Sequence, residues 1–418
     1  MSDKVYIISV GMTKFGKFLE KSIKDLTGEA LQSVQKDNDT DMSDIEAAWF
    51  SNSGWGMATF QHCIRGQVAL SANGIEKIPI TNVENACAGG STAFQGAWTA
   101  IKAGLYQCAL AIGTEKGYSE DREKMMQGFI AGTDVERTTK LIEQLKKMEK
   151  KRKEREAKKE GVSEVKEKKG GHSAFMDLYA MGARNHMKKY GTTQRQLAII
   201  ASKNHTNSSM NPLAQYTFPL TVEQALEDYV VAYPLTRSMC APVGDGSAAA
   251  ILCSQKYLKE HPALVNRAIL IRASVLKSGS WTSDDIAKRA AETAYKTSGL
   301  TPKDINVAEV HDATAFGELY QIEQMGFCPI GQGGPFTESG ATALDGTIPI
   351  NTSGGLLSRG HPIGASGLAQ IYELVAQLRG EAGERQIKNA RIALAENGGG
   401  NIGPGEAALC VHILEKKY

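Results

Sequence analysis

An ordered series of segments occurs twice in this 418-residue chain, and the duplication limits its fold more than any other feature. Each copy begins with an apolar run and later contains the tripeptide Ile-Pro-Ile. The matching segments are 4–11 with 268–275, 43–51 with 302–312, 78–80 with 348–350, and 108–117 with 391–400. Chance produces one matching tripeptide more readily than four matches in the same order. The sequence therefore predicts two copies of one unit, with their turn regions meeting around a pseudo-two-fold axis.

Apolar strand-like runs alternate with helical stretches in both copies. The helices are expected over 23–34, 93–105 and 283–297, and the tripeptide 78–80 is expected to end a buried strand. Alternation of this kind indicates an α/β fold of largely parallel sheets covered by helices.

Composition and charge exclude several classes of protein. A net charge of +2 argues against a general nucleic-acid binder, since nothing in the global field would attract a polyanion. No run of 18 or more apolar residues occurs, so we expect no membrane span. The chain starts directly with a strand-like run and has no signal-peptide pattern. Its seven cysteines form no CxxC pair, which predicts a reduced, cytoplasmic protein without a disulfide scaffold or zinc ribbon.

Residues 143–169 are nearly all charged and divide the two copies. Such a segment cannot bury a core face, so we expect a solvated helix or mobile loop, and its lysines could alternatively meet a substrate phosphate. Helical spacing returns over 174–191 and 193–205, and 242–253 is typical of a turn that enters a buried strand.

Cys87 lies in the stretch NACAGGSTAF, where a strand turns into a helix. The free amides and dipole of a helix N-terminus favour a thiolate and can hold a developing oxyanion. A buried structural cysteine is the alternative interpretation. By itself the stretch leaves both open.

Two histidines and one glycine-rich turn follow strand ends in the second copy. His361 lies in the rigid turn GHPIGASG, and His311 directly follows the apolar strand 307–310. Glu396 and Asn397 open the turn ENGGGNIGPG, whose glycines permit close approach of backbone to a ligand. Singly, each is also compatible with an ordinary turn. Together with Cys87 they are the equipment of acyl transfer through a thioester.

The series NACAGGS, HDA, GHPIGASG and ENGGG in a duplicated α/β chain resembles the thiolase superfamily, in particular its sterol-carrier-protein-2-type, archaeal and bacterial branch. The likeness covers nearly the whole chain. It implies a five-layered αβαβα fold with an N-terminal half over 1–118 and 200–262, an inserted loop region over 119–199, and a C-terminal half over 263–418. It also implies coenzyme A as substrate, no metal, and a homodimer or dimer of dimers.

The resemblance further implies roles for individual residues. Cys87 would accept the acyl group and His361 would activate it, while His311 would donate to a first oxyanion hole. The backbone amides of Cys87 and Gly398 would form a second hole. Lysines and arginines of the inserted region are the candidates for binding coenzyme A.

Two positions depart from the family pattern. Thiolases commonly carry a second cysteine, the acid/base of the carbon–carbon step, in a CxGGG turn, and here that position is Glu396. In the sterol-carrier-like branch a cysteine after His-Asp has been proposed for the role, and here that position is Ala313. Glu396 or His311 could abstract the α-proton, since an apolar pocket can raise the pKa of a carboxyl group. Equally, Glu396 could be structural and pair with a backbone amide.

Three functional hypotheses follow. The leading one is thiolytic cleavage of a 3-oxoacyl-CoA, or the reverse Claisen condensation, through an acyl group on Cys87. The second is a decarboxylating or synthase-type condensing enzyme with a Glu or His base. The third is a thiolase-like subunit that needs a small zinc-binding, OB-fold partner for acyl-CoA. The acyl substrate itself is not predicted.

Overall fold

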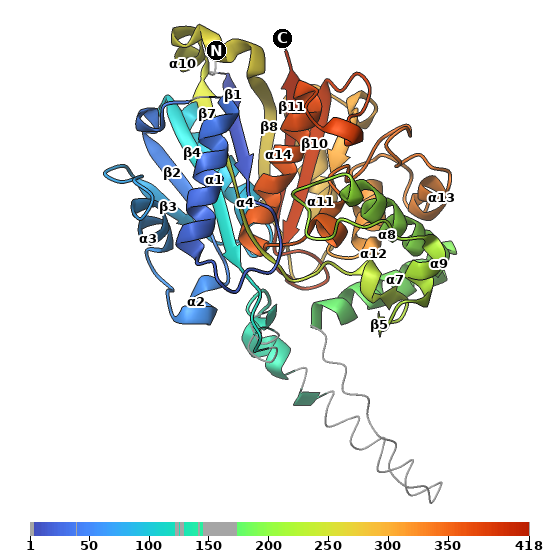
Figure 1. Cartoon of the computed structure of the whole chain (residues 1–418). Coiled ribbons are helices and arrows are strands. Elements are labelled where there is room, and N and C mark those ends of the chain that lie inside the picture. The colour runs from blue at the N-terminus through green and yellow to red at the C-terminus, as the bar shows by residue number, and fades with distance from the viewer. Residues whose placement is uncertain are drawn as a thin grey trace, which may run out of the picture.

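The computed structural model describes residues 4–38, 40–121, 125, 129–140, 143–144 and 174–417. Its largest sheet has the strand order β3-β2-β4-β7-β1-β8-β11-β10-β9 (Figure 1). The first half of the chain supplies β1 (Val5–Met12), β2 (Ala47–Ser51), β3 (Ile80–Val83), β4 (Cys108–Lys116) and β7 (Asp245–Ser254). The second half supplies β8 (Ile269–Ser278), β9 (Val307–Glu309), β10 (Ile392–Gly399) and β11 (Ala408–Lys416).

The two halves of the sheet have the same strand order about the junction of β1 and β8, where Tyr6 pairs with Leu270. On one side β7, β4, β2 and β3 follow β1. On the other side β11, β10 and β9 follow β8, and Ile350 bridges Ala308 at the position that corresponds to β3. Matching strands occupy matching places, which confirms the predicted duplication.

Pairing directions are mixed, and the prediction of largely parallel sheets is wrong for the centre of the sheet. Only the outer pairs of β2 with β3 and β4, and of β9 with β10, are parallel among the described strands. All contacts of β1, β7, β8 and β11 are antiparallel. In one case the reason is plain, because β11 follows β10 through the loop 400–407 without a crossover helix.

Helices cover and separate the two halves of the sheet in five layers. The middle layer is α4 (Gly89–Lys102) packed against α14 (Ser366–Arg379), and one apolar core joins both helices to the inner faces of the two halves. On the outer faces, α1 (Ile23–Asn38) covers the first half and α11 (Ile286–Ser298) covers the second. The three helices expected at these places are confirmed, with ends that shift by a few residues.

The tripeptide 78–80 does not end a buried strand as expected. Strand β3 begins at Ile80, continues to Val83 at the edge of the sheet, and is half-exposed. An edge strand has a neighbour on one side only and is therefore less buried than a central strand. The tripeptide precedes this strand and overlaps it only at Ile80. Cys87 nevertheless follows the end of β3 at Val83 by four residues and lies two residues before the start of α4 at Gly89.

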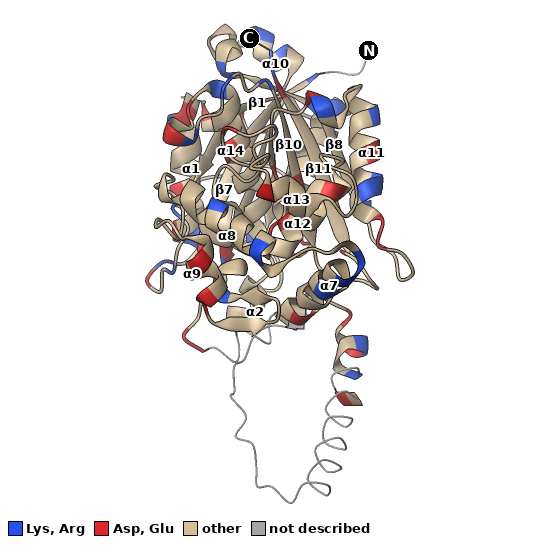
Figure 2. Ribbon diagram, turned by 90° about the vertical axis from the view of Figure 1, so that its right-hand side faces the viewer, with Lys and Arg blue, Asp and Glu red and all other residues tan. Residues whose placement is uncertain are grey.

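A smaller helical unit with its own apolar core lies beside the second half of the sheet (Figures 1 and 2). It contains α7 (Ala174–Tyr190), α8 (Gln194–Ser209), α9 (Val222–Glu227) and α12 (Ala315–Gln324), with the hairpin of β5 (Val230–Ala232) and β6 (Leu235–Thr236). Thr193 caps α8 by accepting from the backbone N–H of Gln196, whose side chain in turn accepts from the N–H of Thr193. The predicted charged segment 143–169 lies outside the described residues except for 143–144.

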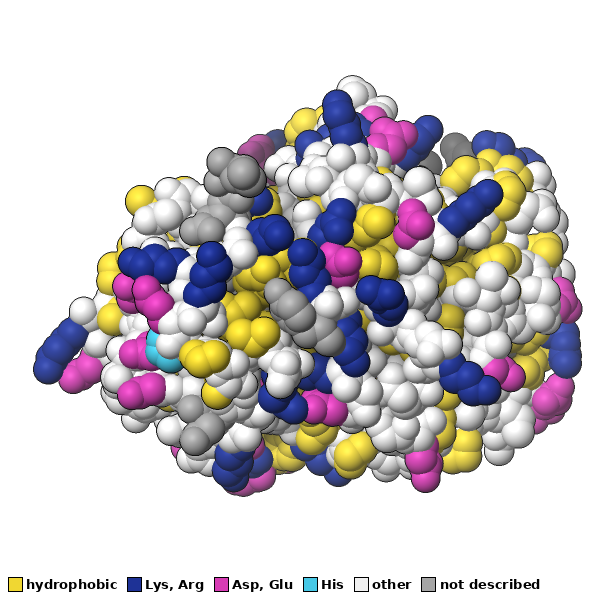
Figure 3. Space-filling model, turned by 90° about the horizontal axis from the view of Figure 1, so that it is seen from above, with side chains coloured by type: hydrophobic (Ala, Val, Ile, Leu, Met, Phe, Trp, Pro, Cys, Tyr) yellow, Lys and Arg dark blue, Asp and Glu magenta, His cyan; other side chains and the backbone are white. Residues whose placement is uncertain are grey.

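Among the shorter described helices are α2 (Trp55–Thr59), α3 (Arg65–Ser71), α10 (Gln255–Glu260) and α13 (Gly333–Glu338). None of the helices in the described ranges has the length and hydropathy to cross a membrane. Basic and acidic side chains are intermixed on the face that Figure 3 shows.

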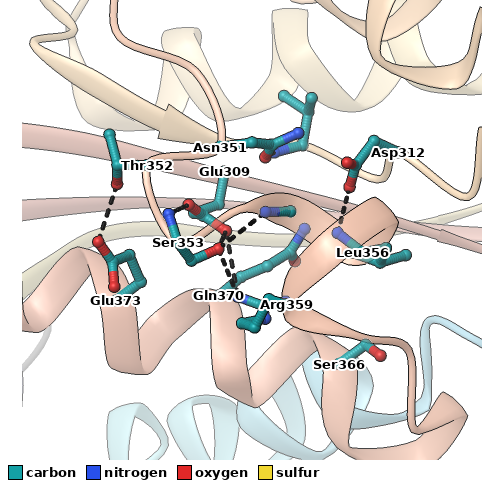
Figure 4. A network of polar contacts seen from close by, with 12 residues as sticks. Glu309, Asp312, Asn351, Thr352, Ser353, Leu356, Arg359, Ser366, Gln370 and Glu373 are labelled. Atoms are coloured by element: carbon teal, nitrogen blue, oxygen red, sulfur yellow. Dashed lines mark hydrogen bonds and ion pairs between the residues drawn. The ribbon is translucent and has the colours of Figure 1, made fainter. Parts of the chain in front are cut away.

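A buried polar network ties the end of β9 to the loop 351–360 (Figure 4). Arg359 Nη1 donates to Glu309 Oε2 at 3.1 Å, and both side chains are at most 1% exposed. Ser353 adds its hydroxyl, 2.6 Å from the same oxygen, and the backbone N–H of Leu356 donates to Asp312 Oδ1 at 2.6 Å. Residues 309–312 are thus fixed against the segment that leads to position 361.

The ion pair predicts a large stability effect. Arg359→Met keeps the apolar bulk but leaves the Glu309 charge buried without its cation, so the free energy of unfolding should fall by about 3–5 kcal/mol. Urea unfolding followed by circular dichroism would measure it. Lys288→Met is the matched control, since Lys288 pairs with Glu292 at 4.0 Å with both side chains 65% exposed. Its effect should stay within about 0.5 kcal/mol. Equal stability of the two variants would contradict the prediction.

Candidate active site

Cys87 lies in a strained turn just before α4. Ala86 has a φ of 48°, which is uncommon for a residue with a side chain. The turn from the second half approaches it so closely that a Cβ at Gly399 would lie 2.3 Å from the backbone nitrogen of Ala88. Glycine is therefore required there, and the two halves of the chain meet at the cysteine.

His361 contacts the sulfur of Cys87 directly, with 3.2 Å between Nε2 and Sγ. Its other ring nitrogen, Nδ1, is 2.7 Å from Ser366 Oγ, and the Ser366 hydroxyl donates to the carbonyl of Pro362 at 2.9 Å. Since that hydroxyl proton is engaged, Ser366 accepts from Nδ1–H. The lone pair of His361 is then on Nε2, where it can take the thiol proton of Cys87.

His311 has the opposite tautomer. The side-chain amide of Asn397 donates to His311 Nδ1 at 3.0 Å, so the ring proton is on Nε2. The rings of His311 and His361 meet edge to face, with centroids 5.4 Å apart. Ligand atoms of these two histidines and of Cys87 all lie within 4.8 Å of one another. The site therefore combines a thiol, a base and an N–H donor in one small volume.

Burial raises the pKa of the Cys87 thiol to about 12, and nearby Glu115 adds to the shift. Burial also lowers the pKa of His311 to about 4 and that of His361 well below its ordinary value. The resting pair is therefore a thiol with a neutral imidazole. This differs from the expectation of a thiolate, because the loss of water around the sulfur and the charge of Glu115 outweigh the favourable backbone amides.

The amides that favour the ionised sulfur belong to Cys87 itself and to Gly400. The predicted partner Gly398 lies nearby and lines the same cavity. The carbonyl oxygen of an acyl group attacked by the sulfur could meet N–H groups from this glycine turn, as its sequence suggested. The specific role of Gly398 stays a prediction.

Glu396 is fully buried, and its Oε2 accepts from the backbone N–H of His311 at 2.8 Å. Burial raises the pKa of this carboxyl group well above its usual range. The described residues that line the cavity include Gly398 and Gly400 but not Glu396. The observed contact matches the structural alternative, in which Glu396 pairs with a backbone amide and holds His311 in place.

The cavity over these residues has a volume of about 1170 Å³. Its lining joins the catalytic candidates to α2, α7 and α12, and it contains Ala313, the second position where a cysteine could have stood. Lys24, Lys116 and Lys189 are the described lysines on its walls, and Lys189 belongs to the basic last turn of α7, shown in blue in Figure 2. Most of the predicted basic contributors from the inserted region lie outside the described residues.

Family models cover most of the chain. The model described as "Thiolase, N-terminal domain" matches residues 5–233, and the one described as "Thiolase C-terminal domain-like" matches residues 272–415. The chain belongs to the thiolase superfamily. It is accordingly a thiolase-like acyltransferase, and the resemblance drawn from the sequence motifs is confirmed.

Curated relatives and solved structures agree with this membership. The chain is 37% identical to acetyl-CoA acetyltransferase of Methanothermobacter thermautotrophicus over 420 residues, which cover 99% of both chains. It is 34% identical to human sterol carrier protein 2, covering 94% of this chain and 69% of that protein. The fold is similar to that of the Ltp2-ChsH2(DUF35) aldolase, at a TM-score of 0.75 and 21% identity over 99% of this chain and 97% of the other. Human mitochondrial 3-ketoacyl-CoA thiolase gives a TM-score of 0.66 at 16% identity, covering 100% and 99%.

Several residues of this thiolase site were not found by sequence reasoning. Ser366 lies inside the GHPIGASG motif, but a serine at that place carries no signal of the contact that fixes a tautomer. Glu115 accepts from the backbone of Ser53, Gly54 and Gly364, and so joins the first half to the histidine turn. Glu406 directly follows the glycine-rich turn ENGGGNIGPG. The sequence shows this position, so a carboxylate near the site could have been predicted from it.

Thiol and imidazole groups also bind transition metals, and Cys87, His311 and His361 are the set with suitable spacing among the described residues. The hydrogen bonds of the two histidines leave Nε2 of His361 unprotonated and Nε2 of His311 protonated, which suits these atoms to accept and to donate a proton, respectively.

The raised thiol pKa predicts slow alkylation of Cys87 near neutral pH. Only the thiolate reacts, so the rate with iodoacetamide should rise about tenfold per pH unit between about pH 7 and about pH 9.5 and reach no plateau. Peptide mass spectrometry would follow Cys87 and the exposed Cys63 in the same sample. A plateau for Cys87 below about pH 8 would show that the sulfur rests as a thiolate.

Proposed function

We propose that this thiolase-like protein catalyses coenzyme A-dependent cleavage of a 3-oxoacyl-CoA, or the reverse condensation, through an acyl group on Cys87. The contact of 3.2 Å between Cys87 Sγ and the unprotonated Nε2 of His361 carries the proposal. It is the arrangement of a nucleophile beside its base, with Ser366 orienting the base.

The resting charges favour this chemistry. Cys87 attacks the carbonyl carbon as His361 takes its proton, so an imidazolium and an oxyanion form together from a neutral pair. The Nε2–H of His311 is set by Asn397 to donate, and its low pKa keeps it neutral at physiological pH. Donors that need no rearrangement stabilise developing charge in a site with little water. The backbone amides of Cys87 and Gly400 are a second set of donors at the sulfur.

Coenzyme A is the proposed second substrate. The residues that line the cavity include Cys87 as well as Lys24 and Lys189. The side chains of these two lysines could bind the phosphate groups of coenzyme A. Apolar side chains from α2, α7 and α12, among them Met57, Leu178 and Phe316, line the space between. A homodimer or dimer of dimers in the cytoplasm remains part of the proposal, on the resemblance alone.

Acylation of Cys87 is the direct test. After mixing with acetyl-CoA and a series of longer acyl-CoAs, the intact mass should increase by one acyl group, and peptide mapping should place it on Cys87. Cys87→Ala should abolish the adduct, whereas Cys63→Ala, at an exposed cysteine, should leave it unchanged. His361→Ala should slow acylation by about 10²–10⁴-fold. A folded protein that none of these thioesters acylates would refute the function.

A partner subunit is the second proposal, and one comparison supports it. The solved Ltp2-ChsH2(DUF35) aldolase pairs two components in its name, and this chain shares its fold over 99% of its own length. A small zinc-binding, OB-fold protein that delivers acyl-CoA is the kind of partner expected from the resemblance. The retained Cys87 distinguishes an active thiolase with a partner from an inactive scaffold.

Native purification tests the partner. If one is required, the chain made alone should form the Cys87 adduct but turn over slowly, and a small zinc protein should co-purify from the native host and restore the rate. Size-exclusion chromatography with zinc analysis would measure this. A homo-oligomer that is fully active by itself would contradict the requirement.

A further inference from the structure

A carboxyl group outside the predicted site shares the cavity with Cys87. Glu406 belongs to the loop 400–407 between β10 and β11 and lines the same cavity as Cys87, His311 and His361. A Cβ added at Gly398 would lie 2.9 Å from Glu406 Cγ and 3.1 Å from its Oε1. The side chain therefore packs on the backbone of β10 beside the reacting groups.

We propose that Glu406 carries the proton to and from the α-carbon of the acyl-CoA, the step for which this chain has no second cysteine at position 396 or 313. The inference rests on the proposed thiolytic function. It assigns the acid/base to a loop residue rather than to either position where the family pattern carries a cysteine.

The other carboxyl groups near the cavity are less suited to this task. Glu396 is not among the lining residues and holds the backbone of His311. Glu115 lines the cavity but accepts from Asn52 and three backbone amides, so its oxygens are engaged. Asp284 also lines the cavity and accepts from the Tyr320 hydroxyl at 2.9 Å, so the packing of Glu406 on Gly398 of β10, rather than a free oxygen, is what favours Glu406 over it.

The carboxyl group of Glu406 has fewer donors than that of Glu115. Gln321 Nε2 donates to its Oε1 at 2.9 Å, and the backbone N–H of Glu406 also contacts its own carboxylate. Gln321 is 1% exposed on α12, so it fixes the orientation of the carboxyl group. The partly buried Tyr179 lines the same cavity, and burial, then the charges of Glu406 and Cys87, raise the pKa of its phenol.

The protonation state of Glu406 suits a reversible carrier. Burial, and then the negative charge of Asp284, raise its pKa to about 7, so both forms exist at neutral pH. The titratable groups that face it are Asp284 before α11, Tyr179 of α7, Tyr320 of α12 and Glu396 of β10. A pKa near the working pH is what a general acid/base needs.

The protons balance over one turnover. Cys87 adds to the C3 carbonyl of the substrate, and its proton passes to His361. The C2–C3 bond breaks with its electron pair on C2, and the carboxyl group of Glu406 protonates C2, so one acyl-CoA leaves. The thiol of coenzyme A then gives its proton to the Glu406 carboxylate while its sulfur takes the acyl group. His361 returns its proton to Cys87.

Two readouts on the same sample test the assignment. Wild type and Glu406→Gln are mixed with acetyl-CoA in D₂O, and mass spectrometry follows both acetylation of Cys87 and deuterium uptake at the methyl carbon. Glu406→Gln should be acetylated within about threefold of the wild-type rate, because His361 serves that step, but should exchange at least about 100-fold more slowly. Glu406→Asp should recover part of the exchange.

Asp284→Asn is the matched control, since it removes the neighbouring charge and keeps Glu406. It should retain exchange, and the pH midpoint of exchange should move below the wild-type value because no anion favours the protonated form. The inference would be overturned if Glu406→Gln exchanged deuterium at the wild-type rate, or if Glu396→Gln lost exchange while Glu406→Gln kept it. Normal acetylation of Cys87 in the same samples would still uphold the proposed function. A wild-type protein without any Cys87 adduct would instead refute the function, and this inference with it.

Discussion

The buried ion pair of Glu309 and Arg359 sets the geometry on which the site depends. Each partner precedes a catalytic candidate by two residues, since His311 follows Glu309 and His361 follows Arg359 at that distance. A contact of 3.1 Å between segments that are 50 residues apart thus fixes both imidazoles. The two rings then meet edge to face, with their centroids 5.4 Å apart.

The charge state of the two imidazoles and the thiol is also set by the groups around them. Each imidazole has one nitrogen occupied by a neutral partner, Ser366 or Asn397; the other nitrogen of His361 contacts the thiol of Cys87, and that of His311 is free to donate. Burial keeps both rings and the thiol neutral at rest. A neutral site avoids the cost of burying unpaired charge until a substrate arrives to share it.

Sequence reasoning reached the features that local patterns encode. The duplication, the helices around Cys87 and the motifs that carry His311 and His361 all follow from spacing and residue type. The directions of strand pairing do not, because they depend on how β7 and β11 are connected. Nor does the neutral state of Cys87, because the helix start is visible in the sequence while the enclosing walls come from distant segments. Glu406 is visible in the sequence as a carboxylate directly after the glycine-rich turn, but its packing on Gly398 follows only from folding.

The loop 400–407 joins two antiparallel neighbours directly, and none of its residues belongs to the apolar cores of the described chain. Insertions and substitutions in such a loop cost little packing energy. The nucleophile and its histidines, by contrast, are held by both halves of the duplicated core. Divergence within this architecture can therefore proceed by exchanging the part of this connection beyond Gly400, which alters how protons move and keeps the amide that faces Cys87.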